Sequence, residues 1–370
     1  MEVLTGIAPD EGFFALNSSC GTPSLASQTI AFNEGWSMIS TYIIPENTDF
    51  AAFVAPVVES MIIAKDYSGA AYLPEWEFNG IGNLLQGQGY QVKMSSSEVL
   101  VVEGVLIQPE DNPIALNEGW NMVGYLRLEG ANAAAVLADV NATGNLIIAK
   151  DYFGAAYLPE WDFNGIGDML PGQGYQMKTF NADVLQYLSN DASYRLSSVE
   201  LTENNLSYFE KVAATDNNMT VVIEDDAWDV LPTLDSEIAA FDKAGNIIGS
   251  AIYSSPITVV TLWGDDATTP SKDGLVVSEV ISFKVWTSGD VRDLTVTQWS
   301  EGSSSYHVGA ISVASSIETD NTIANLNSTD RVLVKVINVL GQDVNLDDEL
   351  FKGTVLFNIY DDGSVEKVVK

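Results

Sequence analysis

Apolar residues along this chain fall into short runs that turn residues separate. Downstream of residue 187, the runs NNMTVVI, ITVVTLWG, VISFKVW and RDLTVTQW alternate apolar and polar positions or cluster β-branched side chains, with Gly, Asn, Asp and Pro between them. Alternation with a period of two is typical of half-buried strands. The pattern therefore predicts an antiparallel β-sandwich over residues 187–320 and a mainly all-β fold class for the chain. His307, in SYHVGAISV, is expected on one of these strands.

A segment in the N-terminal half is repeated almost unchanged. KDYSGAAYLPEWEFNGIGNLLQGQGYQVKM begins at Lys65 and KDYFGAAYLPEWDFNGIGDMLPGQGYQMKT begins at Lys150, with identity at 23 of 30 positions. FNEGWSMIS and LNEGWNMVG extend the similarity upstream. Such a repeat indicates two copies of one structural unit. We predict two small β-modules, residues 31–102 and 103–186, after an N-terminal arm or linker over residues 1–30.

One short helix is predicted in each module. Alanine and aliphatic residues recur at helical spacing in TDFAAFVAPVVESM (48–61) and GANAAAVLADVN (130–141). Pro56 interrupts the first of these segments, so that helix is expected to be short or bent. At the other end of the chain, residues 321–370 contain three strand-like runs, with DDG at 361–363 as a tight turn, and predict a small C-terminal β domain.

Charge narrows the choice of partners. The formal charge is -35, from 16 Lys and Arg residues against 51 Asp and Glu residues. Such a surface repels a phosphate backbone, so we expect no nucleic-acid partner. No stretch reaches the roughly 18 apolar residues of a membrane-spanning helix, so we expect no membrane span. The start of the chain lacks the pattern of a secretory signal, which predicts either that a signal was removed or that none is used.

Catalytic chemistry finds no support in the sequence. One histidine, His307, and one cysteine, Cys20, cannot build a zinc cluster. Adjacent acids such as Asp225 and Asp226 are frequent in so acidic a chain, and adjacency does not define the geometry of a glycosidase. We therefore expect no catalytic residues and no enzyme activity.

Calcium is the one cofactor that the sequence leaves open. In WGDDATTPSKDG, Asp265, Asp266 and Asp273 have the oxygen ligands that calcium prefers, although the EF-hand pattern is absent. The alternative, which we favour, is that the acidic residues solvate the surface and bind no ion.

The repeated aromatic residues are the candidate ligand-binding residues. Tyr72 and Trp76 of the first copy recur as Tyr157 and Trp161 of the second. Aromatic rings serve sugars and apolar ligands as platforms, so a duplicated glycan site is one interpretation. The favoured interpretation is packing, within a small core or between the copies, because a small module needs its large rings for burial. Whether Trp76 and Trp161 are buried separates the two.

Three resemblances cover nearly all of the chain after residue 30. The repeats, with Gly35–Trp36 and the segment 65–75, resemble the Gly-Trp-Asn type modules of secreted bacterial surface proteins. IAAFDKAGNIIG, WGDDATT and ISFKVW resemble a β-sandwich found beside such modules. VINVLGQDV at 336–344 and YDDGSVEK at 360–367 resemble the C-terminal sorting domain of type IX secretion substrates. Related modules are also similar to structural proteins of marine phages.

These resemblances imply a modular protein delivered to an extracellular or cell-surface location, or alternatively to a virion surface. The function expected is structural or adhesive and non-enzymatic, through contacts with other protein subunits in a homo-oligomer or larger assembly, such as a filament. The alternatives are a carbohydrate-binding surface protein that uses the repeated aromatics to bind glycans, and a phage appendage or fibre component.

Overall fold

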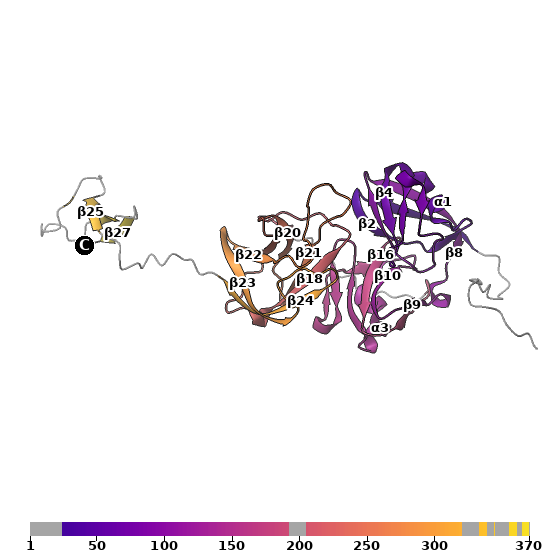
Figure 1. Ribbon diagram of the computed structural model, residues 1–370. Helices are drawn as coiled ribbons and strands as arrows, with labels where there is room; N and C mark the ends of the chain where they lie inside the picture. The colour runs from indigo at the N-terminus through magenta and orange to yellow at the C-terminus, as the bar shows by residue number, and fades with distance from the viewer. Residues whose placement is uncertain are drawn as a thin grey trace, which may run out of the picture. The chain divides into compact units, whose positions relative to one another are not determined.

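The computed structural model describes residues 24–191, 205–319, 333–338, 344, 355–360 and 365–369. Contacts divide the chain into two units, residues 1–318 and 319–370. Strands predominate in both units, which confirms the predicted all-β fold class. In Figure 1 the first unit runs from indigo through magenta to orange, in the order first module, second module and sandwich.

The first module contains two sheets around a small core. A five-stranded sheet has the order β2-β7-β4-β5-β6, and a three-stranded sheet has the order β1-β8-β3. Phe50 lies between them and contacts the rings of Tyr72 and Tyr90, at centroid distances of 5.7 and 5.1 Å. The elements are β1 (Leu25–Phe32), β2 (Gly35–Ile39), β3 (Ile43–Pro45), α1 (Phe50–Val54), η1 (Ala55–Ser60), β4 (Met61–Lys65), β5 (Ala71–Leu73), η2 (Pro74–Trp76), β6 (Phe78–Asn79), β7 (Tyr90–Met94) and β8 (Glu98–Leu106).

The first module tests the predicted short helix and the predicted N-terminal arm. The helix of the first module is short, as expected: α1 is capped by the Asp49 side chain and passes into the 3₁₀ turn η1, which contains Pro56. The arm predicted over residues 1–30 is wrong for its last residues. Because LASQTIAF alternates exposed and buried positions, residues 25–30 pair with β8 and belong to the first module.

The second module repeats this five-stranded sheet in the order β10-β16-β12-β13-β14. Two short pairs, β11-β15 and β17-β9, accompany it. Its helical segment is again broken into short pieces. The elements are η3 (Pro109–Asp111), β9 (Ile114–Leu116), β10 (Gly119–Gly124), β11 (Ala131–Asn132), α2 (Ala133–Val136), α3 (Ala138–Ala142), β12 (Leu146–Lys150), β13 (Ala156–Leu158), η4 (Pro159–Trp161), β14 (Phe163–Asn164), β15 (Asp168–Met169), β16 (Gly174–Thr179) and β17 (Asp183–Leu185).

The two modules contact each other reciprocally. Ile39 forms a bridge with Gln173, and Val123, the counterpart of Ile39, forms a bridge with Gln88, the counterpart of Gln173. A Cβ on Gly89 would stand 3.3 Å from the Cα of Gly174, so the repeated GQGY segments meet backbone to backbone. This is the pattern of a two-fold pair, in which residue i contacts j and j contacts i.

The sandwich follows as a seven-stranded sheet in the order β20-β19-β22-β23-β24-β18-β21. The end strands β20 and β21 also contact each other, so the sheet closes around one core that includes Ile223, Ile238 and Phe283. The elements are β18 (Asn218–Glu224), η5 (Asp225–Ala227), β19 (Glu237–Phe241), β20 (Ile247–Ile252), β21 (Ile257–Trp263), β22 (Ser282–Thr287), β23 (Asp290–Glu301) and β24 (Ile311–Thr319).

Two details of the sandwich differ from the sequence-based expectation. The pair β18-β24 is parallel, because the chain passes through the other strands before it returns beside β18 in the same direction. His307 lies in the turn before β24 and is exposed. The strand there begins at Ile311, after the positive-φ residue Gly309.

The second unit contains one antiparallel sheet in the order β25-β26-β27, in which Val336 and Leu356 are buried. Its strands, β25 (Leu333–Asn338), β26 (Val355–Tyr360) and β27 (Val365–Val369), match the three predicted runs. The predicted turn at 361–363 lies outside the described residues.

Candidate functional site

Each five-stranded sheet has one face turned toward the core of its module and one turned away from it. We call the face turned away the first outer face in module 1 and the second outer face in module 2. Strand alternation and register assign equivalent residues to both. The first outer face has Trp36, Ile63, Lys65, Ala71, Leu73, Phe78 and Lys93, and the second has Trp120, Ile148, Lys150, Ala156, Leu158, Phe163 and Lys178.

Both outer faces contain a tryptophan between two lysines. Lys65 and Lys93 lie with Nζ 5.0 and 5.9 Å from the ring centroid of Trp36. In the second copy, Lys150 lies 4.7 Å from the Trp120 centroid. At these distances each ammonium group forms a cation–π interaction with the tryptophan ring. The interaction orients the lysines for contacts outside the module.

The first cluster binds two aspartates of the sandwich. Trp36 Nε1 and Lys93 Nζ both donate to Asp266 Oδ2, at 2.6 and 2.7 Å. Lys65 Nζ donates to Asp216 Oδ2 at 2.6 Å. Burial alone raises the pKa of Asp266, but hydrogen bonds from Lys93, Trp36 and Thr268 outweigh it and lower that pKa to about 2.

The second cluster meets uncharged groups instead. Lys150 is fully buried and donates to Asn218 Oδ1 and, at 3.5 Å, to Thr220 Oγ1 of β18. Burial, with the charge of Lys178 as a second cause, lowers the pKa of Lys150 to about 7. Within the described residues, Lys150 therefore has no carboxylate partner.

The remainder of the second outer face is covered by the sandwich. Ile148, Ala156 and Leu158 are buried against aliphatic residues of β18, β21 and β24, with Trp161 and Phe163 at the edge of the cluster. Trp161 Nε1 donates to Glu224 Oε1. The aliphatic residues on the sandwich side are Val222, Ile257, Val259, Ile311 and Val313.

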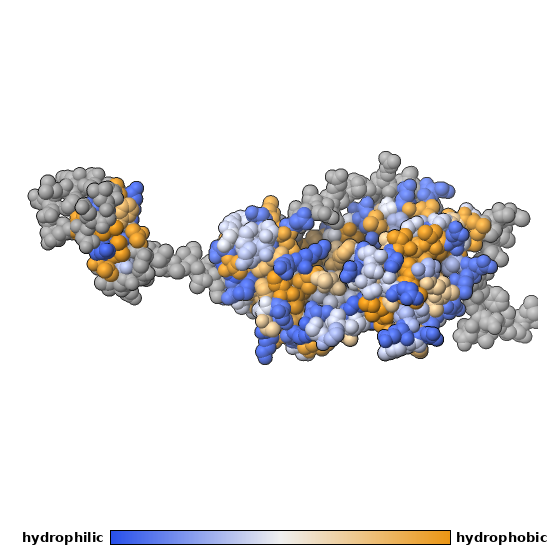
Figure 2. Space-filling view, turned by 90° about the horizontal axis from the view of Figure 1, so that it is seen from above, coloured by the Kyte–Doolittle hydropathy of each residue, from blue (hydrophilic) through white to orange (hydrophobic). Residues whose placement is uncertain are grey.

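The corresponding part of the first outer face is more exposed. Ile63, the counterpart of Ile148, is 8% exposed, but Phe78 is 52% exposed, and Trp76 and Ile62 beside this face are 71% and 42% exposed. Their counterparts Phe163, Trp161 and Ile147 pack against the sandwich. Apolar residues stand in patches among hydrophilic ones on the surface of the first unit (Figure 2). Contiguous exposed apolar residues rimmed by polar ones mark sites of interaction.

The four predicted ligand-binding residues do not share one site. Tyr72 and Tyr157 are buried in the two module cores, because the middle residue of AYL points inward while its neighbours point outward. Trp76 is open, and Trp161 is half-buried against the sandwich. Sequence reasoning missed the lysine-flanked tryptophans. The signal was present, since four of only 16 basic residues occupy equivalent positions of the repeat.

The three predicted calcium ligands are engaged in hydrogen bonds of the protein itself. Asp266 accepts from Trp36 and Lys93 through Oδ2 and from Thr268 through Oδ1. Asp265 accepts from the Asp273 amide, and Asp273 from the Asp266 amide. Within the part of the chain that the structure describes, no group of three or more acidic, His or Cys residues is arranged to hold a metal ion. Calcium binding at this loop stays a prediction.

Comparison with known proteins adds little. No protein-family model matches the chain, and no curated protein matches it. A solved structure described as a biofilm associated protein, BSP domain, has 9% sequence identity and a TM-score of 0.13, with coverage of 80% of this chain and 63% of that one. This chain thus spans less than two thirds of that structure, and a likeness of this size supports neither a fold nor a function. Among the described helices, none has the length and apolarity needed to cross a membrane.

Proposed function

We propose that this chain is a non-enzymatic structural or adhesive protein at a cell surface or, alternatively, a virion surface, and that it works through protein–protein contacts. The observation that carries the proposal is the exposed apolar edge of the first module, formed by Phe78 of the first outer face with Trp76 and Ile62. The same residue types, in the same register, bind another domain in the second module. A surface that is already a working interface in one copy is suited to be one in the other.

The partner we propose is a second copy of the chain, with the two first outer faces packed around a two-fold axis. Closed pairs of this kind bring the same patch of each subunit together, and the two modules already meet reciprocally inside the chain. Ile62, Trp76 and Phe78 supply the apolar area, with a contribution of about 25 cal/mol for each Å² removed from water.

Charge repulsion opposes this pairing and should make it depend on salt concentration. Glu75 and Glu77 are exposed beside Trp76, and the formal charge of each chain is -35. Two copies therefore repel each other at low ionic strength. Screening shortens the Debye length from about 8 Å at physiological salt to about 3 Å at 1 M, so salt should strengthen the assembly.

Sedimentation velocity of the full chain tests the proposal. We expect self-association that rises with protein concentration and with salt, and that is lost in Trp76→Ala/Phe78→Ala. Phe153→Ala is the matched control, since Phe153 is an aromatic residue of the second module that is 51% exposed. A wild type that stays monomeric under all these conditions, or a double variant that associates as well as the wild type, would show the proposal to be wrong.

A further inference from the structure

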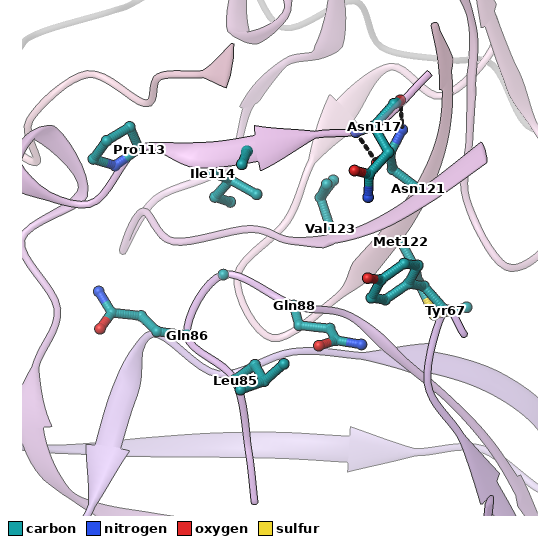
Figure 3. A pocket seen from close by; sticks show the side chains of 12 residues that line it. Tyr67, Leu85, Gln86, Gln88, Pro113, Ile114, Asn117, Asn121, Met122 and Val123 are labelled. Carbon is teal, nitrogen blue, oxygen red and sulfur yellow. Dashed lines mark hydrogen bonds between the residues drawn. The ribbon is translucent and has the colours of Figure 1, made fainter. Parts of the chain in front are cut away.

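A cavity of about 190 Å³ lies where the two modules meet. One wall is the 85–88 loop of the first module with Tyr67, and the other is formed by β9 and β10 of the second (Figure 3). Pockets for drug-sized ligands measure roughly 300–1,000 Å³. This cavity therefore has room for a single ring rather than for an extended chain.

Every residue that lines the cavity is uncharged, in a chain with 51 acidic and 16 basic residues. A charged ligand would find no counter-ion there and would pay for its desolvation. The chemistry on offer suits a neutral ligand that forms hydrogen bonds.

Several polar groups around the cavity have no hydrogen-bond partner among the residues that the structure describes. The Nε2 atom of Gln88 is buried without a hydrogen bond, and Gln88 itself is only 8% exposed. Among the hydrogen bonds of the described residues, none uses the Tyr67 hydroxyl or the side-chain amides of Gln86 and Asn117. A buried donor without a partner is destabilising, so a ligand hydroxyl that reaches Gln88 would offset that loss.

The cavity wall is also fixed in place. Asn121 Oδ1 accepts from the Asn117 amide at 2.8 Å, and Asn121 Nδ2 donates to the Asn117 carbonyl at 2.9 Å, as the dashed lines in Figure 3 show. These bonds hold the backbone of residue 117 and leave its side-chain amide available.

The equivalent position across the module pair is closed. There Asn33 Nδ2 donates to the Tyr152 hydroxyl at 2.6 Å, whereas the counterparts Asn117 and Tyr67 form no such bond. Tyr152 is also covered by Phe153, with ring centroids 3.9 Å apart, where the first copy has Ser68.

The side-chain amides at the cavity are also absent or engaged at the closed position. Pro171 stands where the first copy has Gln86, and Gln173, the counterpart of Gln88, accepts from the Tyr175 hydroxyl at 3.1 Å. The two repeated segments thus differ at a few residues that matter here. These differences leave the cavity beside Tyr67 open and lined with amides, and they close the equivalent position beside Tyr152.

We propose that this cavity binds one neutral pyranose ring of a glycan. Side-chain amides have both donors and acceptors, which match the paired hydroxyls of a sugar. The half-exposed ring of Tyr67 offers an apolar surface for the sugar's C–H face. The site uses other residues than the proposed self-association, so either proposal can fail alone.

Saturation-transfer NMR on the full chain tests this site. The probes are the methyl glycosides of glucose, galactose, mannose and N-acetylglucosamine, with glucuronic acid as a charged comparison and N-acetylglycine N-methylamide as a peptide comparison. We expect at least one neutral glycoside to bind, and glucuronic acid to bind more weakly. Binding of the peptide amide without any glycoside, or no binding of any glycoside, overturns the proposal.

Substitutions of cavity residues test whether the glycoside binds in this cavity. Tyr67→Ala and Gln86→Ala change exposed side chains, so the fold should survive, and each should weaken binding about tenfold, the value of one hydrogen bond or stacking contact. Ser68→Phe/Gln86→Pro copies the closed position and should abolish binding. Tyr152→Phe is the matched control and should bind as the wild type does. Affinity unchanged in all three cavity variants, with wild-type melting temperatures, would refute the site.

Discussion

The two modules share a sequence and differ in what covers them. Leu158 and Ile148 of the second outer face are buried in the cluster shared with the sandwich. Of their counterparts in the first module, Ile63 is 8% exposed and Leu73 is partly exposed, while Trp76 beside them is open. The sandwich follows the second module in the chain, and a tethered domain binds its neighbour at a high effective concentration. The sandwich contacts both outer faces, through ion pairs on the first and an aliphatic cluster on the second, so the nearly identical outer-face residues do not by themselves decide how fully each copy is covered.

The lysines show a second difference. Lys65 pairs with Asp216 at a partly exposed position, whereas Lys150 is buried among neutral groups. The equivalent lysines thus have different roles: Lys65 forms an ion pair, and Lys150 is a desolvated hydrogen-bond donor.

The largest expected effect comes from truncation of the equivalent leucines. Leu158→Ala removes a side chain that is 0% exposed in the cluster shared with the sandwich, and should lower the free energy of unfolding by about 3 kcal/mol. Leu73→Ala should cost roughly 1 kcal/mol, because its side chain is already partly exposed. Urea denaturation of both variants measures the difference. Equal losses would mean that the sandwich does not pack on the second outer face.

The equivalent glycines Gly69 and Gly154 give a smaller contrast. Both have left-handed backbone, with φ of +85° and +83°, so alanine is strained at either position by about 1–2 kcal/mol. At Gly154, a Cβ would also stand 2.5 Å from Thr261 Cγ2 of the sandwich, whereas at Gly69 nothing lies within 4 Å. Gly154→Ala should therefore cost about 1–2 kcal/mol more than Gly69→Ala, measured by the same denaturation. A reversed order would contradict the contact between β21 and the second module.

Much of the fold was predictable because the patterns that specify strands and turns lie within short segments of the sequence. Alternation and turn residues located the strands, and the repeat located the two modules. The burial of Tyr72 and Tyr157 was also accessible, since AYL on a strand must place its tyrosine opposite to its alanine and leucine. That alternation was not used to separate these two tyrosines from Trp76 and Trp161.

The interfaces were not predictable from one sequence. Trp36 meets Asp266 across 230 positions of the chain, and no local pattern encodes such a contact. The outer faces also have almost the same residues in both copies, so the sequence cannot say which copy is covered. Asp266 was singled out as a possible calcium ligand, whereas its oxygens accept from Trp36, Lys93 and Thr268.

The smallest expected effect separates the two lysines by their pH dependence. The pKa of Lys150 is about 7 in the folded protein and near 10.5 when exposed. Between these values the unfolded chain binds one proton more, so the contribution of Lys150 to stability rises with pH and is lost as pH falls toward 7. The wild type should gain about 1 kcal/mol per pH unit above pH 7.5 relative to Lys150→Met.

Lys65→Met is the control for this effect. Lys65 forms a partly exposed ion pair with Asp216, so its removal should cost less than about 1 kcal/mol, and its pH slope is the reference for that of Lys150→Met. Urea denaturation at pH 7.5 and 8.5 measures both variants against the wild type. The range stops below pH 10 because the unfolded tyrosines ionise there, while burial holds the pKa of Tyr90 and Tyr125 at about 12 in the folded state. If Lys150→Met follows the wild type at both pH values, Lys150 is hydrated and the second outer face is open like the first.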